Sequence, residues 1–334
     1  MPYNLVFITG ATGFIGGHIV AATLRAGYRV RLSIRRTDQI QKLNEVFSDF
    51  TDQLDFIVIP DITIPDAFVE AVRGVDYVVH IASPMLGQGI DFRTDFVDPA
   101  VQGTLSVLNA AKSNPSVKRV LIMSSILALV PIGALQGPPI SVQENSRTKI
   151  KVDLDMEIPD GPAGHGTKYQ GSKILAHQAT TDWVESHKPD FFVLTFHPTF
   201  VIGPSLFQRK AGDIDSINRF FFDTVQTGTP IIPPVLVDVR DVADAFVQAL
   251  VASVPKQQEF ILSGPPTTWV EVCSEVQSLY PDEGFKSGPP DEEQPSMTVS
   301  TRAARELLGI QWKSLRELVC GVIDQQLALK AQPA

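Results

Sequence analysis

Tyr169 and Lys173 have residue types and a spacing that suit acid–base chemistry. Four positions apart on a helix, their side chains lie one above the other on the same face. A free phenol has a pKa of about 10 and transfers protons poorly at neutral pH. Because nearby positive charge favours the phenolate, Lys173 should lower that pKa. We therefore interpret Tyr169 as a proton donor and Lys173 as its support.

A glycine-rich turn near the N-terminus supplies a candidate cofactor anchor. Gly10 permits a tight turn, Gly13 lets the backbone approach a phosphate, and Gly16 lets a helix pack on the preceding strand. The turn follows the apolar run 5–9 and precedes an apolar helical pattern, which is the context of a dinucleotide site. A structural turn without a ligand is the less favoured alternative. The expected cofactor contacts are Gly10, Thr12, Gly13, Phe14, Ile15 and Gly16.

Basic residues follow the second apolar run, 30–34. NAD sites usually carry a carboxylate there for the ribose hydroxyls. Arg35 and Arg36 instead offer forked donors that suit a 2′-phosphate, and Lys42 adds a third cation within reach. The sequence favours NADPH/NADP+ over NADH as cofactor, with solvated surface arginines as the alternative.

Apolar runs of strand length alternate with helical patterns through the first half of the chain. The pattern predicts an α/β fold, a Rossmann-type doubly wound parallel sheet, with a smaller and mostly C-terminal α/β lobe. Ligands of such sheets bind beyond the carboxyl ends of the strands. The expected strands are 5–9, 30–34, 56–59, 76–81, 120–123 and 191–196, and the first helices are 14–27, 66–72 and one that Asp98 caps.

The domain boundaries follow from where this alternation stops. We assign residues 1–197 to an NADP-binding Rossmann domain, to which 236–255 return, and 198–235 with 256–334 to a substrate-binding lobe. Residues 129–165 are rich in proline, glycine and charge, and predict a surface excursion with little regular structure. Further helices are expected at 215–225, 241–251, 301–308 and 315–327, and a loose loop at 281–297.

The composition of the chain limits which classes of partner it can bind. The 334 residues are 44% apolar with a formal charge of −9, which argues against a nucleic-acid surface. With two cysteines, no signal-peptide pattern and no apolar run of membrane length, we expect a cytoplasmic protein that is a monomer or homodimer and acts on a small molecule. His165 and His177 flank the catalytic helix without a third ligand at sensible spacing, so we predict solvated histidines and no metal.

At this point the chain resembles an extended short-chain dehydrogenase/reductase, in the group of dihydroflavonol reductases and yeast-type aldehyde and ketone reductases. The match covers most of residues 4–255 in the right order. Its motifs are residues 9–16, Arg35, 61–62, His-Ile-Ala-Ser-Pro at 80–84, 100–104, Met-Ser-Ser at 123–125, Tyr-Gln-Gly-Ser-Lys at 169–173, His-Pro-Thr at 197–199, 203–204 and 237–242.

The resemblance implies a role for each matching residue. Ser125, Tyr169 and Lys173 would form the catalytic triad, with Ser124 as the rival serine and Lys173 also holding the nicotinamide ribose. Arg35 and Lys42 would grip the 2′-phosphate. The other implied cofactor contacts are Asp61 and Ile62 at the adenine, Ala82 and Ser83 at the ribose and pyrophosphate, and Pro198 and Val201 near the nicotinamide.

Three departures bear on the substrate. His177 replaces the family's usual glutamate, Ile126 replaces a small residue at the expected substrate wall, and residues 133–165 do not match the flavonoid-reductase pattern. Together they argue against dihydroflavonol itself. The expected pocket includes Pro84, Met85, Ile126 and Phe200. The aromatic run 220–222 either lines this pocket or packs in the core.

These observations predict an NADPH-dependent reductase of ketones or aldehydes, with a mid-sized apolar substrate. Alcohol oxidation of the 3β-hydroxysteroid dehydrogenase kind and sugar-nucleotide epimerisation or dehydration are alternatives on the same fold. Residues 200–235 offer few basic groups for a diphosphate-sugar. A regulator that binds NADPH without turnover is the alternative outside enzymes, and an intact serine, tyrosine and lysine argue against it.

Overall fold

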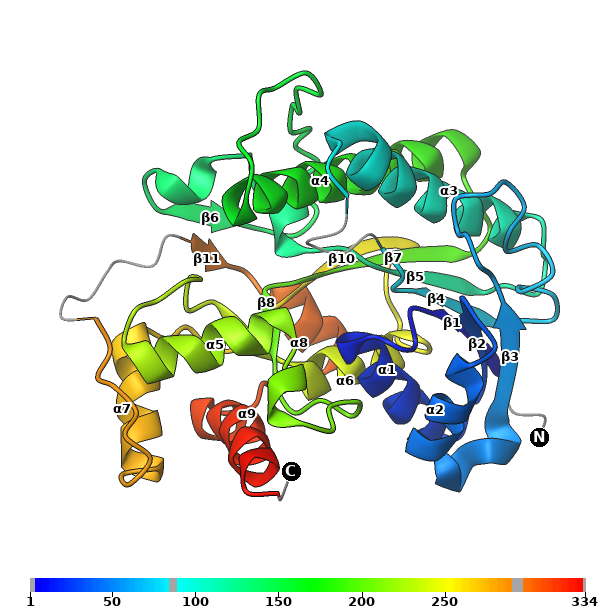
Figure 1. Ribbon diagram of the computed structural model, residues 1–334. Coiled ribbons are helices and arrows are strands. Elements are labelled where there is room, and N and C mark those ends of the chain that lie inside the picture. Colours follow the sequence, from blue (N-terminus) through cyan, green and yellow to red (C-terminus); the bar gives the residue numbers. More distant parts are fainter. Residues whose placement is uncertain (1–3, 84–88, 290–296, 333–334) are drawn as a thin grey trace.

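The computed structural model describes residues 4–83, 89–289 and 297–332. Figure 1 shows a layered α/β molecule, in which a seven-stranded sheet has helices on both faces. All of its strand pairs are parallel, so the predicted doubly wound sheet is confirmed. The strands, in spatial order, are β10 (Gln257–Leu262), β7 (Phe192–Pro198), β5 (Arg119–Met123), β4 (Tyr77–His80), β1 (Leu5–Thr9), β2 (Arg29–Ile34) and β3 (Leu54–Val58).

The central strand β1 shows why an almost uninterrupted apolar run forms this sheet. Its successive side chains point to opposite faces, and both faces are covered by helices. Val6 and Ile8 pack into the apolar cluster on one face. Phe7 packs into a second cluster on the other face, against Phe68. A strand buried on both sides needs apolar residues at consecutive positions, not at alternate ones.

Two pairs of helices enclose the sheet. Helices α1 (Phe14–Arg25) and α6 (Val239–Ala249) pack together on one face. Helices α3 (Asp98–Lys112) and α4 (Pro162–His187) pack together on the other, above the strands in Figure 1. Helix α2 (Gln39–Val46) lies beside β2 on the α1 side.

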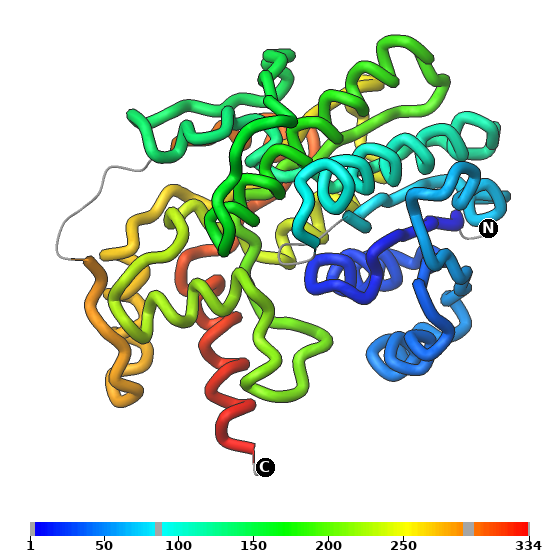
Figure 2. Tube along the Cα trace, turned by 45° about the horizontal axis from the view of Figure 1, so that its top comes forward, coloured from blue at the N-terminus to red at the C-terminus, as the bar shows by residue number. Residues whose placement is uncertain are grey.

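A third apolar cluster forms the core of a smaller lobe. Figure 2 shows its C-terminal helices gathered with residues 200–235 at the side of the molecule away from the N-terminus. Two short parallel pairs accompany it, β8 with β9 and β6 with β11. The elements are β6 (Ile140–Val142), β8 (Phe200–Ile202), α5 (Ser216–Thr227), β9 (Leu236–Asp238), α7 (Trp269–Leu279), β11 (Met297–Val299), α8 (Arg302–Leu308) and α9 (Leu315–Lys330).

The structure corrects three expectations. Residues 66–72 form consecutive turns instead of a helix, and Asp66 has a positive φ of 65°, outside the helical region. Asp98 is helical and not a cap, since a π-helical turn at Arg93–Val97 runs directly into α3. Strand β10, assigned to the lobe from sequence, pairs with β7 at the edge of the main sheet.

Two further findings concern the whole chain. Among the described residues, no helix combines the length and the apolar character needed to cross a bilayer. Both cysteines carry free thiols: Cys273 is buried in the lobe and Cys320 is half-buried on α9.

Candidate active site

The glycine turn has the geometry that its sequence predicts. Gly10 adopts a φ of +74°, and a Cβ there would lie 2.9 Å from the backbone nitrogen of Ala82. A Cβ at Gly16 would overlap the carbonyl oxygen of Gly10, which is how closely α1 approaches the turn. The Gly13 N–H donates to the Gly10 carbonyl at 3.1 Å, and Gly13 is the N-cap residue that precedes α1. Because the glycines leave the backbone at this helix N-terminus uncovered by side chains, a pyrophosphate can bind there.

A buried contact that we did not predict fastens this turn to β4. The Thr9 hydroxyl accepts from the N–H groups of Ile81 (3.0 Å) and Ala82 (3.1 Å), and it contacts His80 Nδ1 at 3.0 Å. Two accepted bonds leave the threonine proton for His80. Burial lowers the pKa of His80 to about 3, so the ring is neutral and accepts that proton. A hydroxyl at the end of a buried apolar strand was the available sequence signal.

Ser125 and Tyr169 meet at the carboxyl end of β5. The Ser125 side chain is buried, and its Oγ accepts from the Leu127 N–H at 3.2 Å. Tyr169, on α4, lies close enough to Ser125 for that side chain to lower the pKa of the phenol. The rival Ser124 is also buried, and its N–H donates to the Phe196 carbonyl at 2.7 Å. The contact with the phenol favours Ser125 as the catalytic serine.

Burial controls the protonation of the tyrosine–lysine pair. It raises the pKa of Tyr169 to about 12, against a smaller lowering by the nearby Ser125 side chain. We expected Lys173 to lower this pKa, but its ammonium lies 5.5 Å from the centre of the phenol ring and donates to Ser83 Oγ at 3.0 Å. Burial also lowers the pKa of Lys173 to about 8. The phenol therefore holds its proton at neutral pH.

The backbone between the two catalytic candidates is itself a packing surface. Gly171 lies midway between Tyr169 and Lys173, and a Cβ there would lie 2.5 Å from the ring of Phe92. The Phe92 ring thus occupies the space of the missing side chain. Phe92 belongs to an apolar cluster with Phe96 and Val97 that anchors this part of α4.

The three predicted phosphate ligands have different surroundings. Arg36 donates from Nε and Nη2 to the two carboxylate oxygens of Asp38, each at 3.0 Å. The Lys42 ammonium lies over the Phe207 ring, 4.9 Å from its centre. Arg35 is exposed and sits close enough to Asp61 to help the hydrogen bonds of Thr63 lower the pKa of that carboxyl. Contact of these cations with a phosphate remains a prediction.

The implied adenine residues lie where β3 ends. Asp61 closes a turn by accepting from the Thr63 N–H (2.8 Å) and hydroxyl (2.7 Å). Ile62 contacts Gly103 of α3. Thr12, Phe14 and Ile15 are near the start of α1 and only Thr12 precedes the helix. Their contacts with a cofactor also remain predictions.

The residues predicted to line the substrate pocket are only partly described by the structure. Pro84 and Met85 lie outside the described residues. Pro198 ends β7, and Val201 of β8 is buried beside half-buried Phe200. Ile126 is only 2% exposed and belongs to an apolar cluster with Val130 and Ile261, so it offers little surface to a substrate. Phe221 and Phe222 are core residues of the lobe, whereas Phe220 packs against that core half-buried.

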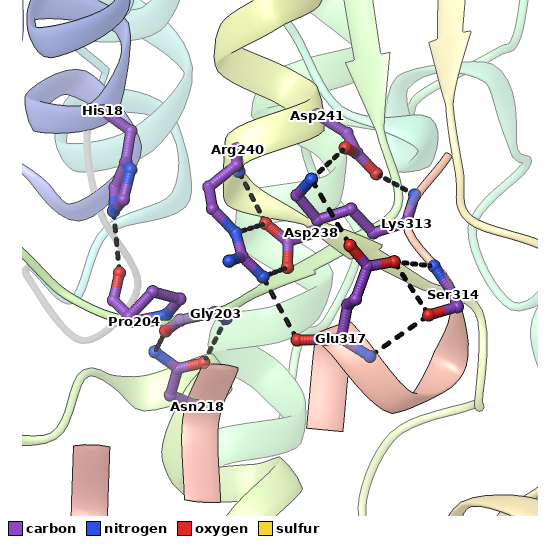
Figure 3. Close-up of polar contacts among 10 residues, drawn as sticks. All are labelled: His18, Gly203, Pro204, Asn218, Asp238, Arg240, Asp241, Lys313, Ser314 and Glu317. Carbon is purple, nitrogen blue, oxygen red and sulfur yellow. Dashed lines mark hydrogen bonds and ion pairs between the residues drawn. The ribbon is translucent and has the colours of Figure 1, made fainter. Parts of the chain in front are cut away.

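A polar network joins the cofactor helix to the lobe (Figure 3). His18 of α1 contacts the Pro204 carbonyl through Nε2 at 2.7 Å. The adjacent Gly203 exchanges two hydrogen bonds with the Asn218 side chain, at 3.0 and 2.8 Å. A separate group of contacts, from Asp238 through Arg240, reaches the Glu317 carbonyl of α9. The motifs at 203–204 and 237–242 therefore hold the two parts together.

Comparison with known proteins identifies the family and agrees with the fold. The model of the NAD dependent epimerase/dehydratase family matches residues 6–262. Ketoreductase sphI of Aspergillus fumigatus is 34% identical over 98% of both chains, and ketoreductase azaE of Aspergillus niger is 31% identical over 96% of this chain and 97% of its own. The crystal structure of yeast methylglyoxal/isovaleraldehyde reductase Gre2 with NADPH superposes with a TM-score of 0.83, at 24% identity over 98% of this chain and 99% of the other. The chain belongs to the NAD dependent epimerase/dehydratase family, the extended short-chain dehydrogenases/reductases.

Proposed function

We propose that the protein is an NADPH-dependent carbonyl reductase, which converts a ketone or aldehyde to an alcohol. The observation that carries the proposal is the meeting of Ser125, Tyr169 and Lys173 beside the glycine turn. When bound there, NADPH supplies the hydride for the carbonyl carbon. The relatives named ketoreductases support the same reaction class.

The protein groups have separate tasks in this proposal. The Ser125 hydroxyl hydrogen bonds to the substrate oxygen and orients the carbonyl. Tyr169 donates its proton to that oxygen as negative charge develops on it. A pKa of about 12 keeps the phenol protonated at neutral pH, which suits the donor of a reduction. Lys173, held by Ser83, supplies positive charge beneath the phenol and a donor for a ribose hydroxyl.

The preference for NADPH is supported by charge. Arg35 and Arg36 follow β2 at the position where a carboxylate would favour NADH. Arg35 is exposed, and the surface pair of Arg36 with Asp38 is weak enough to open for a phosphate. The glycine cradle fits the pyrophosphate of either cofactor, so the basic residues carry the choice between them.

The test is NADPH consumption, followed at 340 nm with a panel of aldehydes, α-diketones, bulky aryl ketones and a flavanonol. We expect turnover of an apolar ketone with NADPH and little with NADH. Tyr169→Phe should reduce kcat by at least about 100-fold and leave NADPH affinity unchanged. Tyr28→Phe is the matched control, because Tyr28 lies against Tyr77 at the amino ends of the strands, and it should keep full activity.

Two results would overturn the proposal. Retained activity in Tyr169→Phe would remove the phenol from the reaction. Tight NADPH binding by the native protein without consumption of any carbonyl compound, or of a hydroxyl compound with NADP+, would favour the regulator.

A further inference from the structure

A second group of reactive side chains lies on the far side of Ser125 from the cofactor turn. His177 of α4, His197 of β7 and Glu259 of β10 each offer one ligand atom, and these atoms lie within 4.8 Å of one another. We expected His177 to be solvated, and this is wrong: its side chain is 11% exposed and contacts Glu259. His165 is half-buried beside Phe96.

The hydrogen bonds of His197 fix its tautomer. Nδ1 lies 3.1 Å from the Ser125 carbonyl oxygen, which can only accept, so Nδ1 carries the proton. In the neutral ring Nε2 then presents a lone pair, at present toward the Thr195 hydroxyl at 3.1 Å. A histidine that donates one N–H to a backbone carbonyl and presents the other nitrogen has the outer-shell arrangement of metal-binding imidazoles.

His177 and Glu259 complete the donor set. His177 Nε2 lies 3.1 Å from Glu259 Oε1, close to the separation of two ligands on one tetrahedral ion, about 3.4 Å. His177 Nδ1 is buried and has no hydrogen-bond partner among the described residues. The His177 and His197 rings meet edge to face with centres 4.7 Å apart. The second carboxylate oxygen of Glu259 accepts from the Asn145 N–H at 2.6 Å, which holds the carboxylate in place.

We propose that His177, His197 and Glu259 bind a transition-metal ion of the Zn²⁺ class, behind the catalytic serine. Two imidazoles and one carboxylate are a zinc ligand set that leaves a fourth position open. A cavity of about 180 Å³, lined by His177 and Glu259, provides room for a water at that position. The ligand atoms lie within 4.8 Å of one another, so side-chain rotation must draw the most distant ones together by at most about 1.4 Å, toward the 3.4 Å of a tetrahedral site.

The ion would cross-link three secondary-structure elements. It would join α4, which carries Tyr169, to β7 and β10, and Thr195 pairs with Glu259 across these two strands. His197 would keep its bond to the Ser125 carbonyl, so binding at the metal would also fix the backbone of the catalytic serine. Because the ion binds only the folded arrangement, it should raise the thermal stability of the protein.

The experiment uses tag-free, chelator-treated protein with Zn²⁺ or Co²⁺ as probe. Equilibrium dialysis should give one equivalent of metal, Co²⁺ should develop the visible absorption of a four-coordinate site, and the melting temperature should rise. His177→Gln and Glu259→Gln should each weaken binding by more than about tenfold, since loss of an outer-shell partner alone costs about that much. His187→Gln is the matched control: it removes a histidine from the same helix, outside the cluster, and should bind like the native chain.

Each alternative result contradicts the site. No uptake by the native protein would rule the site out, and equal uptake by His177→Gln and the control would show an adventitious ion only. A thiolate-to-cobalt charge-transfer band would place the metal at a cysteine. Circular dichroism checks folding, and if Glu259→Gln fails to fold, His177→Gln decides the question. None of these measurements depends on reductase activity, so they remain informative if the proposed reaction is wrong.

Discussion

Two arginine–aspartate pairs in this molecule share one geometry and differ in burial. Arg36 holds Asp38 and Arg240 holds Asp238, each across two residues and each through Nε and Nη2. The Arg36–Asp38 side chains are 74% and 64% exposed, whereas the carboxylate of Asp238 is fully buried. Water reaches both members of the first pair, but in the second pair it reaches only the Arg240 guanidinium, which is 38% exposed. The exposed Arg36–Asp38 pair can therefore exchange its carboxylate for a phosphate of the cofactor. The buried Arg240–Asp238 pair instead stabilises the junction between the Rossmann domain and the lobe.

The largest expected effect comes from breaking the buried pair. Asp238→Ala should lower the free energy of unfolding by about 3 kcal/mol, because it removes the charged hydrogen bonds between Arg240 and a buried carboxylate. It also removes the cap of α6, where Asp238 accepts from the Arg240 N–H at 2.8 Å. Urea unfolding measures the change. A loss below about 1 kcal/mol would mean that burial does not distinguish the two pairs.

The neighbouring Asp241 is also buried but, among the described residues, has no arginine bound to its carboxylate. It therefore tests whether burial by itself disfavours the ionised form. Burial raises its pKa from 3.8 to about 6, against the hydrogen bond from the Lys313 N–H. The native state thus binds this proton more tightly than the unfolded chain does. The protonated carboxyl therefore stabilises the fold fully below about pH 4, and this stabilisation is lost as the pH rises through about 6. Asp241→Asn should be more stable than the native chain at pH 8 by up to about 3 kcal/mol, with no such gain at pH 4. Urea melts at both values check this, and an equal effect at both would contradict it.

At the exposed edge the expected effect is on cofactor choice. Arg35→Ala should raise KM for NADPH about tenfold and leave KM for NADH unchanged, since one charged hydrogen bond is worth about 1.5 kcal/mol or more. Lys112→Ala, at the end of α3, is a matched removal of a surface cation. Parallel rises for both cofactors would place Arg35 outside the phosphate site.

The smallest effect should come from breaking the exposed pair. Asp38→Ala should change the free energy of unfolding by at most about 1 kcal/mol. It should lower KM for NADPH a few-fold, because Arg36 no longer has to leave a carboxylate to meet a phosphate. Urea unfolding and initial rates with both cofactors measure the two effects. A large loss of stability would show that exposure does not weaken this pair.

Local chemistry explains what the sequence predicted well. The sheet and the glycine turn follow from apolar runs and from a φ that only glycine adopts freely, both visible within a few residues. The burial of His177 depends on Glu259, 82 positions away, so no local pattern carried it.

The excursion after residue 129 had a signal that we did not use. Val152, Leu154, Met156 and Ile158 alternate with charged residues, and in the structure they pack on the cluster of Phe92 and Phe96 without forming a strand. We based the prediction of a surface excursion on the charged residues, which form the exposed face of this alternation. The apolar half determines where the segment lies, because its partners come from 50 or more positions earlier in the chain.

The ring of Phe92 against Gly171 has a consequence for protein engineering. Any side chain at position 171 would push this ring, and with it the helix that places Tyr169 and Lys173. Libraries aimed at new substrates should therefore leave positions 92 and 171 fixed. Variation belongs around Phe200 and at positions 230, 231, 233 and 234, which are exposed or only partly buried.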